Sequence, residues 1–180
     1  MPMEAGDVLR MLAALDAAQI AVWLDGGWGI DALAGWQTRP HDDLDLVIAL
    51  DGVDAAIRAL APLGFAVAED LRPVRIVLRA GDGRGLDLHT VIFDADGNGH
   101  QPQPDGSTFA YTHAGLAGHG TIASQPVRCL TAELQMACHM GYEPDAQDVA
   151  DLWVLRDHCG LTLPPAYERL VVSVREPPSP

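Results

Sequence analysis

The sequence predicts a mixed α/β (α+β) fold, in which a mixed β-sheet is flanked by helices and followed by a helical C-terminal part. Three observations support this prediction. Short apolar, β-rich runs alternate with segments whose apolar residues recur at helical spacing. A GDGRG turn at residues 81–85 joins two such runs as an antiparallel hairpin. Beyond residue 130 the spacing is helical. The chain has 180 residues, of which 48% are hydrophobic, so it can bury one globular core.

Each element follows from its local pattern. The first helix has apolar residues at helical spacing from Val8 to Leu15, and Gly35 is expected to end the second helix. From the N-terminus, the expected elements are a helix over residues 4–19, a strand over 20–24, a helix near 28–34, a strand over 44–50, a helix with Val53, Ile57 and Leu60 inward, and strands over 65–68, 74–78 and 86–93.

The chain after residue 93 is predicted to change character. Residues 94–118 are rich in Gly, Pro, Asp and Ser, which predicts a long irregular loop. The remaining expected elements are helices over 131–142, with Thr131 as N-cap, over 145–158 and from near Pro164, before a frayed tail REPPSP. The predicted organisation is a core over residues 1–110, then a loop and helical segment over 111–180 that either belongs to the same domain or forms a separate one.

The charge balance is strongly acidic. The chain has 25 Asp and Glu against 11 basic residues, all of them Arg, for a net charge of -14. Such a surface repels the phosphates of DNA or RNA, so we expect no nucleic-acid partner. The same field attracts a polycationic small molecule, although a charge that serves solubility alone is an equally good explanation.

Cysteine usage and hydropathy indicate a cytoplasmic location. The three Cys residues are odd in number and lack CxxC spacing, which indicates reduced thiols. The N-terminus lacks the pattern of a signal peptide, and no apolar run approaches the ~18 residues of a membrane span. We therefore expect no membrane association.

Three aspartates are candidate metal ligands. Asp43 and Asp45 lie one residue apart in a predicted strand, so both carboxylates point to the same face and repel each other unless a cation separates them. Asp87 lies on the outward face of a later strand, and if the two strands are neighbours the three carboxylates converge. Such a set suits two Mg²⁺ ions ~3.5–4 Å apart, as used for displacement at phosphorus.

A glycine pair precedes these aspartates. Gly26 and Gly27 follow a strand and precede a helix, where backbone N–H groups can approach a phosphate closely. Arg39 is the nearest cation and is a candidate contact for the leaving pyrophosphate. His41 either contacts phosphate or shapes the loop. Each feature alone has a structural explanation as a turn or a solvated surface, whereas their ordered combination is hard to produce by chance.

This combination, DGGWGIDALAGWQTRPHDDLDL at residues 25–46, resembles the opening motif of antibiotic nucleotidyltransferases of the polymerase-beta-like superfamily. The lincosamide O-nucleotidyltransferases and the aminoglycoside 2''-nucleotidyltransferase are the most similar groups. The resemblance extends through GLDLHTVIFDADGNGHQ, PVRCLTAELQMACHMGYEP and DVADLWVL, and covers roughly residues 5–160.

The resemblance implies a nucleotidyltransferase fold and an enzyme of antibiotic resistance. It implies Mg²⁺-dependent transfer of AMP, or another nucleotide, from ATP or another nucleoside triphosphate to a drug hydroxyl. It places functional residues at Asp43, Asp45, Asp87, Gly26 and Gly27. Trp28 stands where the superfamily commonly has a serine, so phosphate contacts here rest more on backbone N–H groups.

The sequence does not decide between two acceptor classes, or between two candidates for the general base. His89 matches the lincosamide-like group, which favours a less cationic acceptor, whereas the charge of -14 favours a cationic one. Either Asp87 or His89 is the general base. Trp28 lines a substrate cleft or belongs to the core, and Tyr111 faces the acceptor or the surface.

Two other classes of function remain as alternatives. The chain could be a non-catalytic, antitoxin-like binding module of the same fold, although a degenerate copy need not keep all three aspartates. It could also modify a protein, while the acidic charge disfavours tRNA. A homodimer that completes the cleft is a further expectation.

Overall fold

The structure is a computed structural model that describes residues 2–173, so the predicted frayed tail lies outside the described residues. Its helices are α1 (Ala5–Ala17), α2 (Gly26–Ala34), α3 (Val53–Leu60), α4 (Ala132–Cys138), α5 (Ala146–Asp157) and α6 (Pro165–Ser173). Its strands are β1 (Val22–Asp25), β2 (Asp43–Ala49), β3 (Phe65–Leu71), β4 (Arg75–Ala80), β5 (Gly85–Phe93), β6 (Gly99–Pro102), β7 (Thr108–Tyr111), β8 (Gly118–Ile122) and β9 (Gln125–Cys129).

A mixed sheet organises the described chain, which confirms the predicted α+β class. The strand order is β3-β4-β5-β2-β1-β9-β8, and β6 and β7 continue from the end of β5. Strand β2 lies at the centre, antiparallel to β1 and parallel to β5. The GDGRG turn joins β4 and β5 as the predicted antiparallel hairpin.

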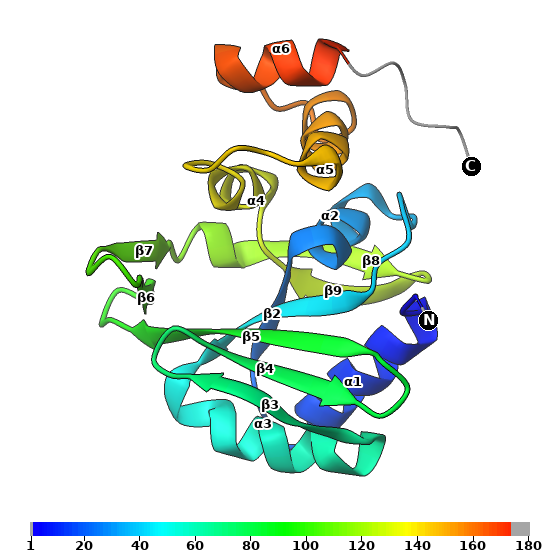
Figure 1. The fold of residues 1–180 in the computed structure, drawn as a ribbon, viewed down its shortest axis with the longest axis vertical. Coiled ribbons are helices and arrows are strands. Elements are labelled where there is room, and N and C mark those ends of the chain that lie inside the picture. Colours follow the sequence, from blue (N-terminus) through cyan, green and yellow to red (C-terminus); the bar gives the residue numbers. More distant parts are fainter. Residues whose placement is uncertain (1, 174–180) are drawn as a thin grey trace.

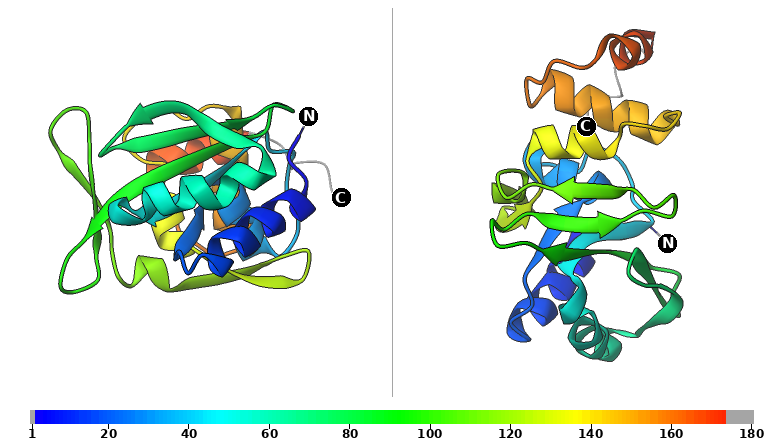
Figure 2. Two further views of the ribbon diagram at one scale, coloured as in Figure 1. Left: turned by 90° about the horizontal axis from the view of Figure 1, so that it is seen from below. Right: turned by 90° about the vertical axis from the view of Figure 1, so that its left-hand side faces the viewer.

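The helices lie on two sides of this sheet (Figure 1). Helices α1 and α3 cover one face, where the inward residues Leu44, Leu46, Leu86 and Leu88 are at most 1% exposed. Helices α4, α5 and α6 stack on the opposite side, as the right-hand view of Figure 2 shows. Since strand side chains alternate, the residues between these leucines face the C-terminal helices.

Two hairpins correct the sequence prediction. Residues 94–118 are not an irregular loop, because β6 and β7 pair within them, with Gly99 opposite Tyr111. The β8–β9 hairpin was not predicted at all. Its two-residue turn, Ala123 and Ser124, has φ of 46° and 65°, a conformation that usually carries Asn-Gly. The turn residues therefore gave no hairpin signal.

Element ends otherwise follow local chemistry. Helix α2 begins at Gly26, two residues earlier than predicted, because Asp25 accepts a hydrogen bond from the Gly26 N–H at 2.7 Å. It ends at Gly35, whose φ of 85° confirms the predicted stop. Thr131 caps α4 by accepting from the Leu134 N–H, as predicted. Within residues 2–173, no helix has both the length and the apolarity needed to cross a bilayer.

Candidate active site

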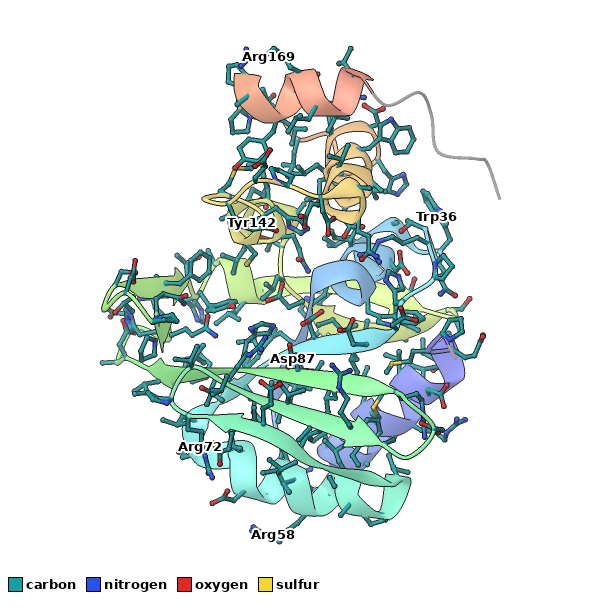
Figure 3. The ribbon with its side chains drawn as sticks, viewed as in Figure 1. Trp36, Arg58, Arg72, Asp87, Tyr142 and Arg169 are labelled. Atoms are coloured by element: carbon teal, nitrogen blue, oxygen red, sulfur yellow. The ribbon has the colours of Figure 1, made fainter. Side chains whose placement is uncertain are left out.

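A row of aspartates crosses the middle of the sheet. The parallel β2–β5 pair sets Asp45 opposite Asp87, which confirms that the two strands are neighbours. The antiparallel β1–β2 pair sets Asp25 opposite Asp45. Asp43 lies two residues from Asp45 and therefore on the same face. Figure 3 labels Asp87 on the sheet and Tyr142 on the C-terminal part above it.

Burial and mutual repulsion make the ionised forms of these carboxylates less favourable. Burial, and then the charges of neighbouring aspartates, raise the pKa of Asp43 and of Asp87. One oxygen of Asp87 lies 3.3 Å from Arg75 Nη1, while its Oδ1 is buried without a hydrogen-bond partner. An orphaned carboxylate oxygen beside two further carboxylates is a chemical environment that favours a bound cation.

His89 provides a positive charge in this row. Its Nε2 lies 3.1 Å from Asp45 Oδ1. Burial acts to lower the pKa of His89, but the hydrogen bond to Asp45 and the charges of Asp45, Asp25 and Asp87 outweigh it and raise the pKa to about 9. His89 is therefore an imidazolium at neutral pH in this arrangement.

The glycine turn lies directly against the row. Gly26 has φ of 56°, and a Cβ on it would lie 2.6 Å from Asp45 Oδ2. A Cβ on Gly27 would lie 2.4 Å from the His41 ring and 2.8 Å from Arg39 Nη2. Only glycine allows this close approach, so the start of α2, the carboxylate of Asp45, the His41 ring and the Arg39 guanidinium meet at one place.

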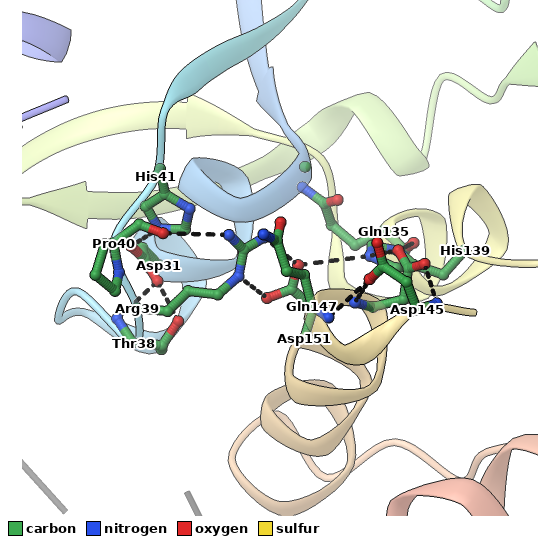
Figure 4. A network of polar contacts seen from close by, with 12 residues as sticks. Asp31, Thr38, Arg39, Pro40, His41, Gln135, His139, Asp145, Gln147 and Asp151 are labelled. Atoms are coloured by element: carbon green, nitrogen blue, oxygen red, sulfur yellow. Dashed lines mark hydrogen bonds and ion pairs between the residues drawn. The ribbon is translucent and has the colours of Figure 1, made fainter. Parts of the chain in front are cut away.

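The two basic candidates are held by buried carboxylates (Figure 4). His41 Nε2 lies 2.5 Å from Asp31 Oδ2, and Asp31 also accepts from the backbone and hydroxyl of Thr38. Arg39 makes a two-point ion pair with Asp151 of α5, at 3.0 and 2.8 Å. These contacts fix the loop between α2 and β2.

The predicted residues line a polar cleft of about 370 Å³ between the core and α4–α5. Gly26, Gly27, Arg39 and His41 form one wall with Asp43 and Asp45. Residues from His139 to Asp151 form the other wall. The cleft therefore gathers most of the predicted phosphate and metal residues in one place. Asp87 is not among its lining residues, because its side chain turns toward Arg75.

A second, larger cavity of about 1250 Å³ meets this cleft. The β6–β7 hairpin, the turn between β3 and β4, and the end of α4 supply its walls, which mix apolar side chains with polar ones. Tyr111, only 3% exposed, lines this cavity, and its OH donates to Gln101 at 3.4 Å. The residues common to both cavities are Asp25, His89, Cys138 and Tyr142.

Trp28, one of the candidate substrate contacts, belongs to the core in the structure. It is 2% exposed, belongs to the main hydrophobic core and lines neither cavity. Its ring packs against His41 with centroids 4.8 Å apart. Trp28 therefore supports the glycine turn from behind, as its apolar character on a short helix also indicates.

Sequence reasoning missed three residues of the site. Asp25 caps α2 by accepting from the Gly26 N–H, and it also lies at the junction of the two cavities with its pKa raised, mainly by burial. His139 and Asp151 belong to the segments predicted only as C-terminal helices, and both line the cleft. These two residues are far from the motif in sequence, with Arg39 and Asp151 separated by 112 positions, so no local signal connects them to it.

The fit of a divalent metal can be judged from these side chains. As they lie, no group of three His, Cys, Asp or Glu residues in the part of the chain that the structure describes is arranged to hold an ion. The donor set nevertheless fits Mg²⁺, because it consists of carboxylate oxygens, one of them orphaned, whose mutual repulsion a cation would relieve.

Comparisons with solved structures define the class of protein. The lincosamide antibiotic adenylyltransferase LnuA, bound to lincomycin, superposes with a TM-score of 0.78 at 25% identity, over 87% of this chain and 99% of that chain. ANT(2'')-Ia in complex with adenylyl-2''-tobramycin superposes with a TM-score of 0.70 at 23% identity, over 94% and 95%. The fold is the predicted nucleotidyltransferase fold.

Sequence comparisons then give the family. A lincosamide resistance protein of Staphylococcus haemolyticus is 26% identical over 81% of this chain and 90% of its own length. A 2''-aminoglycoside nucleotidyltransferase of Escherichia coli is 32% identical over 67% of this chain and 63% of its own length. The family model for aminoglycoside-2''-adenylyltransferase matches residues 7–155, so the chain belongs to this family of antibiotic nucleotidyltransferases.

Proposed function

We propose that the protein transfers a nucleoside monophosphate, from ATP or another nucleoside triphosphate, to a hydroxyl of a lincosamide- or aminoglycoside-type antibiotic. The observation that carries this proposal is the register of β2 and β5, which sets Asp45 beside Asp87 next to the glycine turn. One relative is a lincosamide resistance protein and another is a 2''-aminoglycoside nucleotidyltransferase, which supports these two acceptor classes. The non-catalytic alternative is not favoured, because all three aspartates and the turn are present.

The proposed metal ligands are Asp43, Asp45 and Asp87, which together would hold two Mg²⁺ ions. When bound, the ions would align the triphosphate and neutralise charge that develops during displacement at phosphorus. Metal would compete with His89 for Asp45 and with Arg75 for Asp87, the two cationic partners of these carboxylates. We therefore propose that His89 and Arg75 balance the negative charge of these carboxylates when no metal ion is bound.

The triphosphate is proposed to lie in the smaller, polar cleft. Backbone N–H groups at the start of α2 would donate to the phosphates, that of Gly27 directly and that of Gly26 in place of its hydrogen bond to Asp25. Arg39, held against Gly27, would supply positive charge to the same wall, and His41 would shape it. Arg39 is suited to stabilise the departing pyrophosphate because its ion pair with Asp151 fixes its guanidinium beside the turn.

The acceptor is proposed to occupy the larger cavity, with its hydroxyl near the shared residues Asp25 and His89. Tyr111 would contact the acceptor from the β7 side. Asp87 is one candidate to receive the proton of the attacking hydroxyl; His89 is the other, but only after metal has displaced it from Asp45 and it has lost its own proton. Both are within the aspartate row, so the hydroxyl, the metal ligands and the phosphate wall would meet there.

One experiment tests the proposal. The protein is incubated with ATP, Mg²⁺ and a panel of lincosamides and aminoglycosides, and each drug is examined by mass spectrometry for a nucleotide adduct. We expect an adduct on at least one drug, and none with EDTA or with Asp45→Asn. Failure to modify any drug, together with the absence of metal-dependent triphosphate binding in a calorimeter, would contradict the proposal.

A further inference from the structure

A buried polar network connects the glycine-turn wall of the cleft to the C-terminal helices (Figure 4). Arg39 donates from Nε and Nη2 to the two oxygens of Asp151, at 3.0 and 2.8 Å. A two-point guanidinium–carboxylate pair fixes the orientation of the guanidinium as well as its position. The side chain of Asp151 is 4% exposed, and that of Arg39 is 20% exposed, so solvent screens this pair less than a surface pair.

His139 approaches the same carboxylate from α4. Its Nδ1 lies 2.8 Å from the Gln135 carbonyl oxygen, to which only an N–H can donate. Its Nε2 therefore faces Asp148 and Asp151, each at 3.8 Å, and is favourable there only when protonated. Asp151 thus contacts two basic side chains, Arg39 from the α2–β2 loop and His139 from the C-terminal helices.

The network faces the cleft. Arg39, His139 and Asp151 all line it, opposite or beside Gly26 and Gly27. A Cβ on Gly27 would lie only 2.8 Å from Arg39 Nη2, so the guanidinium lies against the start of α2. A pair that served only to join the α2–β2 loop to α5 would need no such contact with the turn.

We propose that Asp151 is a positioning residue, which holds Arg39 and His139 on the phosphate side of the cleft so that the C-terminal helices complete the nucleotide site. The inference rests on the proposed function, since it takes the ligand of the cleft to be a nucleoside triphosphate. It adds α4 and α5 to the residues that bind the nucleotide, whereas the sequence motif lies entirely before residue 50.

The test is a double-mutant cycle on nucleotide affinity. Binding of ATP with Mg²⁺, in the absence of acceptor, is measured by calorimetry for the unmodified protein, Arg39→Gln, Asp151→Asn and the double variant. We expect each single variant to raise the Kd about tenfold. The double variant is expected to be no weaker than the weaker single variant, because Asp151 acts through Arg39. The KM for the acceptor should stay unchanged.

A matched control lies on the same helix. Asp157 pairs with Arg156 at the exposed end of α5, with Nη2 and Oδ2 2.8 Å apart, and lines neither cavity. Asp157→Asn removes an Arg–Asp pair from α5 without touching the cleft, and the Kd for ATP should not change.

Several outcomes overturn the inference. A purely structural Asp151 would lower the thermal midpoint of Asp151→Asn but leave the Kd of the folded variant unchanged. Tighter binding by Asp151→Asn would show that its negative charge, and not its geometry, governs the cleft. If Asp151→Asn does not fold, an unchanged Kd in Arg39→Gln is sufficient to overturn the inference. Absence of ATP binding by the unmodified protein would instead overturn the proposed function and this inference with it.

Discussion

At the residue scale, two carboxylates of the site differ in the cationic side chain that pairs with each of them. Asp45 is paired with His89, and Asp87 with Arg75, while one oxygen of Asp87 has no partner. The two candidate bases therefore differ in this arrangement. His89 carries a proton at neutral pH, and Asp87 has a free oxygen, so the two have separable roles.

We predict that Asp87→Asn lowers kcat by about 10²–10⁴-fold, because it removes a proposed metal ligand that is also a candidate proton acceptor. His89→Asn keeps a hydrogen-bond donor for Asp45 and should cost less than about tenfold. Rates of adduct formation at saturating substrates measure both effects. A larger loss in His89→Asn than in Asp87→Asn would identify His89 as the base.

The glycine turn gives a second prediction at this scale. Gly26→Ala introduces a Cβ at positive φ and 2.6 Å from Asp45 Oδ2, so it should reduce both the free energy of unfolding and the activity. Gly64→Ala is the matched control, since Gly64 has φ of 89° with nothing within 4 Å of its Cβ. It should lose about 1 kcal/mol of unfolding free energy and keep full activity. Denaturant unfolding and adduct assays separate the two; equal activity in both variants would contradict the argument.

At the element scale, α4 and α5 are joined to the core by charged groups whose titration changes stability. Burial acts to lower the pKa of His139, but its contacts with Asp151 and the Gln135 carbonyl outweigh it and raise the pKa above 6.5. Burial acts to raise the pKa of Asp151, but its bonds to His139 and Arg39 outweigh it and lower the pKa. Both shifts favour the charged pair in the folded state.

A pH dependence follows from the raised pKa of His139. The folded state holds the proton more tightly than the unfolded state, so this contribution to stability is complete below about pH 6.5 and is lost as the pH rises through the folded-state pKa. We predict that the unfolding free energy of the unmodified protein falls over this range more than that of His139→Gln. Urea unfolding from pH 6 upward measures the difference; parallel curves for the two proteins would contradict it.

Elements with a local signal could be predicted from the sequence. The spacing from Val8 to Leu15 gave α1, GDGRG gave the β4–β5 hairpin and Thr131 gave the start of α4. The hairpins β6–β7 and β8–β9 could not be predicted, because their strands span only four or five residues each, and β8 contains two glycines. In β8, a Cβ on Gly120 would lie 2.1 Å from the Ala32 carbonyl oxygen, so glycine serves the contact with α2 there and hides the strand pattern.

At the scale of the whole molecule, the motif at residues 25–46 predicted one wall of the cleft, and the register of β5 completed the aspartate row. The opposite wall could not be predicted, since Asp151 reaches Arg39 only through the docking of α5 on α2. A helical pattern reports which face is apolar, but it does not report which other element that face meets.

The net charge of -14 acts on the whole surface and gives a prediction about the acceptor. We expect the KM for a polycationic aminoglycoside to rise between about 50 mM and about 300 mM salt, as screening shortens the reach of the acidic field. The KM for a singly charged lincosamide should change much less. Steady-state kinetics at several salt concentrations measure both; equal salt slopes would show that the charge does not guide the acceptor.

The β6–β7 hairpin supplies residues from Gln101 to Tyr111 to the larger cavity and none to the polar cleft. In the proposed function, drug preference and phosphate chemistry are therefore encoded by separate segments that touch only at a few shared side chains. Such a division allows the hairpin to diverge, or to be exchanged between relatives, while the reacting groups stay intact. A single scaffold can in this way acquire resistance to chemically unlike drugs through changes in one peripheral ribbon.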